Sequence, residues 1–281
     1  MTAVDAGSGL AAEEIETFWS EGHLVVRGVL TKTEAEHFGG LIRDLLPRGL
    51  DIPDHWQAHD GRIKPFYTPG NQTFDGPDFI PLYQNERLYQ IMSQLLGSPN
   101  LLVRDGSVAI TLRNDAVHES ELSQALHLDP AVPGYVDEFL FTPEELEIGG
   151  CYYFTDVEPG GGGIHVVPGG HRVVEEQSRA VPRGRQRYDR WRKFAHLFPE
   201  TVEVTAAAGD FVLMHHLMPH AASHNRRSRT RLAQFFRYGR VDQPYRVGER
   251  PGDGPADRSF NDLQLAAMSP LGRKLLGVEP W

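Results

Sequence analysis

The chain has 281 residues, of which 40% are hydrophobic, 10% aromatic and 23% charged. This composition suffices for a sizeable core, which excludes a disordered chain, and we expect a single domain over residues 1–281. Asp and Glu total 38 against 28 Lys and Arg, and the resulting formal charge of -10 excludes a nucleic-acid partner because a polyanion would be repelled. The same charge would attract a cationic small molecule, although an acidic surface more often serves solubility alone.

The cysteine content and the N-terminal residues indicate the cellular compartment in which the protein is expected. Cys151 is the single cysteine, which excludes an intramolecular disulfide and a cysteine-based zinc cluster. The first residues are acidic and small where a signal peptide needs a basic start and an apolar run, and no stretch approaches the length of a membrane span. We therefore expect a cytoplasmic protein with no membrane contact, either a monomer or a homodimer.

The N-terminal part predicts a helix, a strand and a second helix, in that order. Residues 12–21 place apolar side chains at helical spacing until Gly22 ends the pattern. Residues 23–30, HLVVRGVL, are rich in β-branched side chains and predict a short strand. Thr31 and Glu34 then form a T-x-x-E capping box, which opens a second helix toward residue 46.

The chain changes from helical to β character near residue 100. Residues 47–82 contain Pro, Gly, Asp and aromatic residues without a sustained period, which predicts an extended, partly ordered surface region. Residues 86–96 predict a third helix that ends at Gly97. Residues 101–114, LLVRDGSVAITLRN, alternate apolar and polar side chains as a strand does.

Short apolar runs separated by turn residues follow, and they predict a sandwich or barrel of antiparallel strands. The runs are CYYFTDV, IHVVPGG, TVEVTAAAGD, FVLMHHL and RLAQFFRYGR. The glycine run 160–163 is predicted to be a hairpin turn. Residues 172–198 are polar and predict a solvated helix or loop insertion. The segment after Val241, with Pro244, Pro251 and Pro255, is predicted to be loop-like before a short helix near 263–268.

His127-Leu128-Asp129 is the first candidate metal-binding element. Residues at i and i+2 of a strand point to the same face, so an imidazole and a carboxylate could share one metal ion. With 13 histidines in the chain, such a triplet arises about once by chance. The alternative is a hydrogen-bonded pair on a half-buried strand.

A second polar cluster, HAASHNRRSRTR, runs from His220 to Arg231 and could supply a third ligand. It follows a strand that begins after the turn Ala208-Gly209-Asp210. Two histidines and one carboxylate on one face of an octahedral ion leave three adjacent positions open, the facial arrangement of non-haem iron(II) oxygenases. Two open positions can chelate a 2-oxo acid, and the third can take dioxygen.

At these residues the chain resembles the phytanoyl-CoA dioxygenase family of iron(II)- and 2-oxoglutarate-dependent oxygenases, over residues 12–240. FWSEGHLVVRGVLTKTEAEHF is similar to the family's opening helix, strand and second helix. EPGGGGIHVVPGGH is similar to the family segment that ends in Pro-Gly-Ser-His, with Gly170 in place of the serine. GDFVLMHH, with His220 and Arg231, resembles the family's distal-histidine strand.

With the strand pattern, this resemblance implies an α+β, β-dominated fold. We expect a double-stranded β-helix core (a jelly roll, cupin-like) at 101–240, a helical N-terminal part at 12–100 packed against one sheet, and a C-terminal extension at 241–281.

The resemblance also assigns site residues. It implies that His127, Asp129 and His220 hold Fe(II), with 2-oxoglutarate and dioxygen as cosubstrates. In the family an arginine eleven residues after the distal histidine binds the far carboxylate of 2-oxoglutarate, and Arg231 has this spacing (231 − 220 = 11). A guanidinium supplies the bidentate partner that a buried carboxylate needs. A surface or structural ion pair is the alternative role for Arg231.

Further contacts to 2-oxoglutarate are assigned to Asn114, Gln124 and Ser223. Ser223 is a candidate to compensate for Ala222, which stands where the family often has serine, and Leu126 stands where it often has an aromatic residue. Tyr152 and Tyr153 lie on a predicted barrel strand with alternate faces, so one of them could border 2-oxoglutarate or the substrate, with core packing as the alternative.

The other histidines have less specific interpretations. His215 and His216 adjoin the predicted strand FVLMHHL and are core residues as readily as cavity residues. Solvated or structural roles are favoured for His118, His165, His171 and His224.

The resemblance implies an oxidoreductase that acts on a small molecule, as in the tailoring of natural products in secondary metabolism and antibiotic biosynthesis. Halogenating relatives have a small residue at the position of Asp129, which favours hydroxylase chemistry here, with desaturation or oxidative cyclisation as variants. Two alternatives remain: a cupin-like metal-dependent isomerase or hydrolase, and a ligand-binding jelly roll without catalysis.

Overall fold

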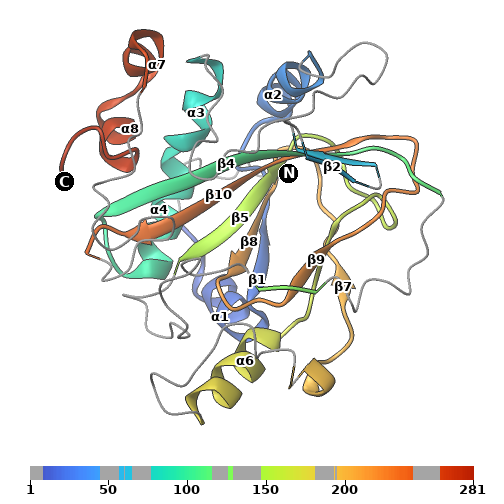
Figure 1. Cartoon of the computed structure of the whole chain (residues 1–281). Coiled ribbons are helices and arrows are strands. Elements are labelled where there is room, and N and C mark those ends of the chain that lie inside the picture. Colours follow the sequence, from blue (N-terminus) through green and yellow to red (C-terminus); the bar gives the residue numbers. More distant parts are fainter. Residues whose placement is uncertain are drawn as a thin grey trace.

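The computed structural model describes residues 9–44, 57–59, 61–64, 77–115, 126–128, 147–180, 193, 195–242 and 260–281. In these residues two antiparallel sheets face each other, with helices along the outer side of the larger sheet (Figure 1). None of the helices described is long and apolar enough to cross a bilayer.

The elements follow the order helix, strand, helix and then mainly strands. The bounds of the helices are α1 (Ala12–Glu21), α2 (Lys32–Asp44), the 3-10 helix η1 (Pro77–Phe79), α3 (Ile80–Tyr83), α4 (Glu86–Leu96), α6 (Gly170–Arg179), α7 (Asp262–Ala267) and α8 (Pro270–Leu275). The bounds of the strands are β1 (His23–Val26), β2 (Gln57–His59), β3 (Arg62–Lys64), β4 (Leu101–Thr111), β5 (Ile148–Tyr153), β6 (Ile164–Val166), β7 (Val202–Glu203), β8 (Phe211–His215), β9 (His220–Ala222) and β10 (Arg231–Arg240).

The N-terminal helices form where local signals predicted them. The N–H of Gly22, at φ 77°, donates to the Phe18 carbonyl and ends α1. The predicted capping box is present at α2, because Thr31 N–H donates to Glu34 over 2.7 Å and Glu34 N–H donates to Thr31 over 3.2 Å. Helix α4 runs over 86–96 as predicted. These three predictions are confirmed.

Among the described strands, the larger sheet has the order β1-β8-β5-β10-β4-β3-β2 and the smaller one β7-β6-β9. The hairpin of β2 and β3 extends the larger sheet beside β4, within the region that the sequence predicted as extended surface chain. The predicted hairpin at 160–163 is wrong, since β5 and β6 do not pair and belong to different sheets. The glycine run instead carries the chain from one sheet to the other.

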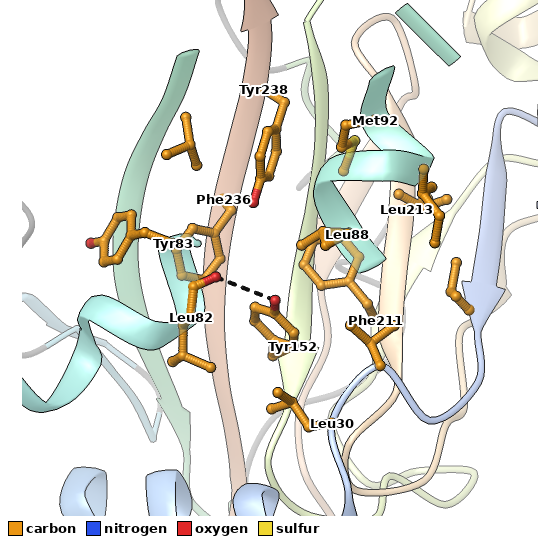
Figure 2. Close-up of a cluster of buried hydrophobic side chains, with 14 of the residues drawn as sticks. Leu30, Leu82, Tyr83, Leu88, Met92, Tyr152, Phe211, Leu213, Phe236 and Tyr238 are labelled. Carbon is orange, nitrogen blue, oxygen red and sulfur yellow. Dashed lines mark hydrogen bonds between the residues drawn. The ribbon is translucent and has the colours of Figure 1, made fainter. Parts of the chain in front are cut away.

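The outer face of the larger sheet packs on helices through large aromatic side chains. Tyr152 of β5 contacts Phe211 and Phe236, with ring centroids 4.8 and 5.5 Å apart. Its hydroxyl donates to the carbonyl of Leu82 at 3.3 Å, which joins the sheet to α3 (Figure 2). Edge-to-face pairs of this kind stabilise a core beyond their buried area. The helices thereby cover the outer face of the larger sheet.

The inner face of the same sheet meets the smaller sheet. Alternate residues of β5, Cys151 and Tyr153, join a second buried cluster with Ile164 and Val166 of β6. The N–H of Ile164 donates to the Tyr153 hydroxyl at 3.1 Å, which ties the two sheets together. Both tyrosines are therefore buried, with Tyr152 packed on the helix side of the sheet and Tyr153 facing the space between the sheets.

Gly150→Ala is expected to destabilise the fold. A Cβ at Gly150 would lie 2.2 Å from the Val212 carbonyl oxygen and 2.4 Å from the Phe211 ring, so the β5–β8 ladder would have to move. Overpacking of this kind costs about 1–3 kcal/mol. Urea denaturation followed by circular dichroism would measure the loss. The neighbouring Gly149→Ala is the control, because its Cβ meets nothing closer than 3.8 Å, and an equal loss in both variants would contradict the prediction.

Candidate metal and 2-oxo acid site

His127 and His220 lie directly opposite each other although 93 residues separate them (220 − 127 = 93). They form an antiparallel bridge in which each backbone N–H donates to the other residue's carbonyl, over 2.9 and 3.0 Å. Their ring centroids are 4.3 Å apart. His220 is buried and His127 is exposed. Two imidazoles that meet in this way can donate to one divalent cation.

The hydrogen bond of His220 selects its tautomer. Its Nδ1 lies 2.8 Å from the backbone carbonyl of Met218. A carbonyl oxygen only accepts, so the proton is on Nδ1 and the Nε2 atom carries the lone pair. This is the arrangement of metal-binding histidines, in which the second nitrogen donates to a carbonyl or carboxylate.

The carboxylate of the predicted triad, Asp129, lies outside the described residues, and so does Gln124. Within the part of the chain that the structure describes, no group of three His, Cys, Asp or Glu side chains forms a metal site. The described portion thus brings together the two histidines, and the third ligand stays a prediction.

Arg231 begins β10 and lies opposite Thr111 of β4. Its side chain is 3% exposed, and its Nε and Nη1 atoms find no hydrogen-bond partner among the described residues. The buried hydroxyl of Thr111 also has no partner within these ranges. A buried cation with unsatisfied donors is costly unless it meets an anion. The pair fits a carboxylate group, and the sequence did not single out Thr111.

The surroundings of Arg231 place it on the inner face of the larger sheet. Burial raises the pKa of the Cys151 thiol to about 12, and the positive charge of Arg231 opposes this shift. Burial likewise raises the pKa of Tyr153, while Arg231 again acts in the opposite direction. Both groups are neutral at physiological pH, so they do not neutralise the guanidinium. A dianion such as a 2-oxo dicarboxylate could do so.

Asn225 holds the segment that leads into Arg231. Its side-chain amide donates to the carbonyls of Thr111 at 3.1 Å and Arg229 at 2.7 Å, and its side-chain oxygen accepts from the N–H of Arg227 at 2.8 Å. Its backbone also bridges Gly161 in the glycine run. Asn225 is fully buried. It therefore fixes the start of β10 against the end of β4, where Arg231 meets Thr111.

Two further residues predicted to contact 2-oxoglutarate, Ser223 and Asn114, make contacts with other parts of the protein. The Ser223 hydroxyl donates to the Gly163 carbonyl at 2.5 Å, a bond that ties β9 to the glycine run. Asn114 lies beyond the end of β4, where its Cβ would be 3.2 Å from a Cβ at Gly61, and its backbone N–H donates to Asn225. Their predicted roles toward 2-oxoglutarate stay predictions.

Two other histidines form a buried pair, and one of them, His215, lines a small pocket together with His220. The rings of His171 and His215 are 4.7 Å apart, and both side chains are under 10% exposed. His171 Nε2 lies 3.1 Å from the Trp19 carbonyl, and Leu217 N–H donates to His215 Nδ1. Burial lowers the pKa of His171, and it lowers that of His215 well below 6.5, helped by the neighbouring His171 and His216.

Stability should therefore fall as the pH drops below 6.5. The pair stays neutral in the folded protein, whereas the unfolded chain takes up protons below the ordinary histidine pKa. Each such histidine adds a slope of about 1.4 kcal/mol per pH unit until the pH reaches its folded pKa. Urea titrations of the metal-free protein between pH 7.5 and 5.5 would measure it. His171→Gln, which keeps a donor for the Trp19 carbonyl, should flatten the slope, and an unchanged slope would contradict the prediction.

Comparison with solved structures shows related folds. The non-haem alpha-ketoglutarate-dependent carbocyclase SnoK from nogalamycin biosynthesis is 20% identical, with a TM-score of 0.59 over 90% of this chain and 95% of that one. EctD from S. alaskensis with bound Fe is 19% identical, with a TM-score of 0.57 over 86% and 82%. HygX from Streptomyces hygroscopicus with nickel, 2-oxoglutarate and hygromycin B is 20% identical, with a TM-score of 0.55 over 83% and 88%.

Sequence comparison identifies the family. No curated protein sequence matches the chain. The family model described as phytanoyl-CoA dioxygenase (PhyH) matches residues 18–233, which span both sheets, the two facing histidines and Arg231. The resemblance inferred from the motifs is thereby confirmed, and the chain belongs to the phytanoyl-CoA dioxygenase (PhyH) family.

Proposed function

We propose that the chain is an Fe(II)- and 2-oxoglutarate-dependent oxygenase that oxidises a small molecule. One observation carries the proposal: Arg231, eleven residues after His220, is buried on the inner face of the sheet with two guanidinium nitrogens unpartnered in the described residues. A dicarboxylate cosubstrate satisfies that charge. The neighbours EctD and HygX, solved with Fe and with nickel plus 2-oxoglutarate, support the same cofactors here.

In this proposal the metal is held by His127, His220 and Asp129, and 2-oxoglutarate is held at its far carboxylate by Arg231 and Thr111. Bound iron, with 2-oxoglutarate and dioxygen, supplies the oxidising power for a substrate C–H bond. The protein's own part is positional. Met218 orients His220, Asn225 orients Arg231, and the packed sheets exclude water from the space between them.

We further propose that the two facing sheets form a double-stranded β-helix in a single domain of a cytoplasmic protein, monomeric or homodimeric. The natural-product setting is supported by SnoK, from nogalamycin biosynthesis, and by HygX, solved with hygromycin B. Hydroxylation is the expected outcome if Asp129 occupies the third protein position on the metal.

The test is anaerobic addition of Fe(II) and 2-oxoglutarate to the protein, with a search for the weak visible charge-transfer band of the chelate. Zn(II) in place of Fe(II) is the control, since it cannot give this band. Succinate release in air then tests turnover. A protein that binds Fe(II) but gives neither the band nor succinate would instead fit the isomerase, hydrolase or non-catalytic alternatives.

A further inference from the structure

A tight turn over residues 215–220 connects the end of β8 to His220. The N–H of His215, the last residue of β8, donates to the Gly22 carbonyl over 2.8 Å and anchors the start of the turn. The N–H of Met218 donates to the His215 carbonyl over 2.9 Å. The carbonyl of Met218 in turn lies 2.8 Å from Nδ1 of His220. The orientation of the His220 imidazole therefore depends on the shape of this turn.

The side chain of His215 closes the same turn. Its Nδ1 atom accepts from the backbone N–H of Leu217 at 3.1 Å. An atom that accepts carries a lone pair, so the imidazole is neutral with its proton on Nε2. Asn and Asp make an equivalent bond to the backbone two residues on, in Asx turns. Leu217 is fully buried, so its N–H would lose its partner at a cost if the acceptor were removed.

Leu217 also connects this turn to the strand of the other metal-site histidine. Its side chain packs in a buried cluster with Leu126 and Leu128, the residues on either side of His127. The backbone of Leu217 is thus held by His215, and its side chain is held against the neighbours of His127. A displaced turn would disturb both facing histidines.

Packing is the alternative role for His215. Its ring centroid lies 4.7 Å from that of His171 and 5.7 Å from that of Trp19, and the side chain is buried. If these ring contacts were its whole role, a phenylalanine would serve as well. A phenyl ring has no acceptor atom, so the two roles predict opposite results for different substitutions.

From these contacts we propose that His215 is a positioning residue for the metal site. Its Nδ1 atom holds the turn in the shape that brings the Met218 carbonyl to His220, which leaves Nε2 of His220 free to bind the metal. The proposal rests on the function proposed above, because it uses the metal ion assigned there to His127 and His220. Loss of the acceptor loosens the ligand set without removing a ligand.

The experiment titrates the full chain with Mn(II) and follows the signal of the free ion by electron paramagnetic resonance. His215→Phe keeps a ring but no acceptor, whereas His215→Asn loses the ring and places Oδ1 where Nδ1 stood. The Phe variant should bind Mn(II) about tenfold more weakly, the lower end of the loss that outer-shell partners give. The Asn variant should stay within about twofold of the native affinity, because its side chain can close the turn.

Co(II) at saturation gives a second readout, because its visible spectrum reports the geometry of the ligands. The spectrum should change in His215→Phe and stay native in His215→Asn. A general loss of stability would leave it unchanged, since the metal-saturated protein is folded. His171→Phe is the matched control: it alters the same buried ring pair, but the hydrogen bond of His171 goes to the Trp19 carbonyl. It should keep the native affinity and spectrum.

If His215→Phe does not fold, His215→Leu takes its place, since Leu and Asn have the same shape and only Asn has the acceptor. Native affinity in the variant without the acceptor overturns the proposal. An equal loss in His215→Asn also overturns it, because the ring rather than the acceptor would then matter. In both cases the native protein still binds Mn(II), so this inference alone is rejected. A native protein that does not bind Mn(II) rejects the proposed function itself.

Discussion

Arg231→Gln should weaken 2-oxoglutarate binding by about 100-fold, the loss expected for two hydrogen bonds to a charged group. The glutamine cannot present the guanidinium fork, and the far carboxylate of the diacid would enter a buried site without a counter-charge. Arg231→Lys keeps the charge but not the fork, so the expected loss is about tenfold. Anaerobic titration of the Fe(II)-loaded protein with 2-oxoglutarate, followed by the charge-transfer band, measures both affinities.

Arg229→Gln is the matched control. Arg229 stands two residues earlier, but its side chain is 56% exposed and pairs with Asp156 at the surface. An exposed pair of this kind contributes little, so the affinity for 2-oxoglutarate should not change. If Arg231→Gln binds 2-oxoglutarate as tightly as the native protein does, Arg231 has a structural role and the isomerase or hydrolase alternative gains.

Stability provides an independent readout for the same variant. Without a diacid, the native chain retains a buried guanidinium with two nitrogens unpartnered in the described residues, so Arg231→Gln should unfold at no lower temperature than the native protein. With 2-oxoglutarate at 100 times its dissociation constant, the native protein should gain about 2.7 kcal/mol. The variant should gain far less at the same concentration. A variant that is much less stable without ligand would indicate a packing role.

The elements that were predictable from the sequence are those whose signals are local. The capping box at Thr31, the helix over 86–96 and the strand over 101–111 depend on residues a few positions apart. The C-terminal helix near 263–268 was also predicted, and it forms as α7, whereas α8 was not predicted. Its start signal, Ser269 with Pro270 at N1, lies in a proline-containing tail that the sequence pattern assigned to loop.

What the sequence could not supply is the pairing of distant strands. Strand β5 pairs with β8 and β10, whereas β6 pairs with β7 and β9. No short stretch of sequence indicates these pairings. The glycine run 160–163 was therefore predicted to join two neighbouring strands as a hairpin. The same limit applies to Thr111, which became a candidate only when β4 and β10 aligned it with Arg231. Because side chains alternate along a strand, the sequence indicated that Tyr152 and Tyr153 face opposite sides of the sheet. Only the packing of the structure shows which tyrosine faces the helices and which faces the smaller sheet.

The spacing of the candidate residues within one motif depends on local geometry, so the sequence alone allows it to be predicted. The eleven residues from His220 to Arg231 span a turn that Asn225 holds by three side-chain hydrogen bonds. The residues of this turn are close together in the sequence, so the spacing between His220 and Arg231 can be recognised as a sequence motif. The facing of His127 and His220 is not local, and the resemblance to a family was needed to expect it.

His220→Ala and Asp129→Ala should each lower the affinity for Mn(II) by more than about 100-fold, because loss of a partner that merely orients a ligand already costs 10- to 100-fold. Free Mn(II) has a distinct electron paramagnetic resonance signal, so titration with the metal measures the bound fraction. His37→Gln and Asp115→Ala are the controls, since both side chains are exposed and lie on other elements. Succinate formation should disappear with metal binding in the two site variants and persist in the controls.

Asp129 provides the sharper of the two tests. Two imidazoles 4.3 Å apart suffice to retain some divalent metal, so His127 and His220 alone would give weak binding in Asp129→Ala. Full affinity needs the carboxylate, which also brings a negative charge to the metal. If Asp129→Ala retains the native affinity, the third ligand is another residue, and the preference for hydroxylation over halogenation falls with it. The facing histidines and Arg231 would remain as the described part of the site.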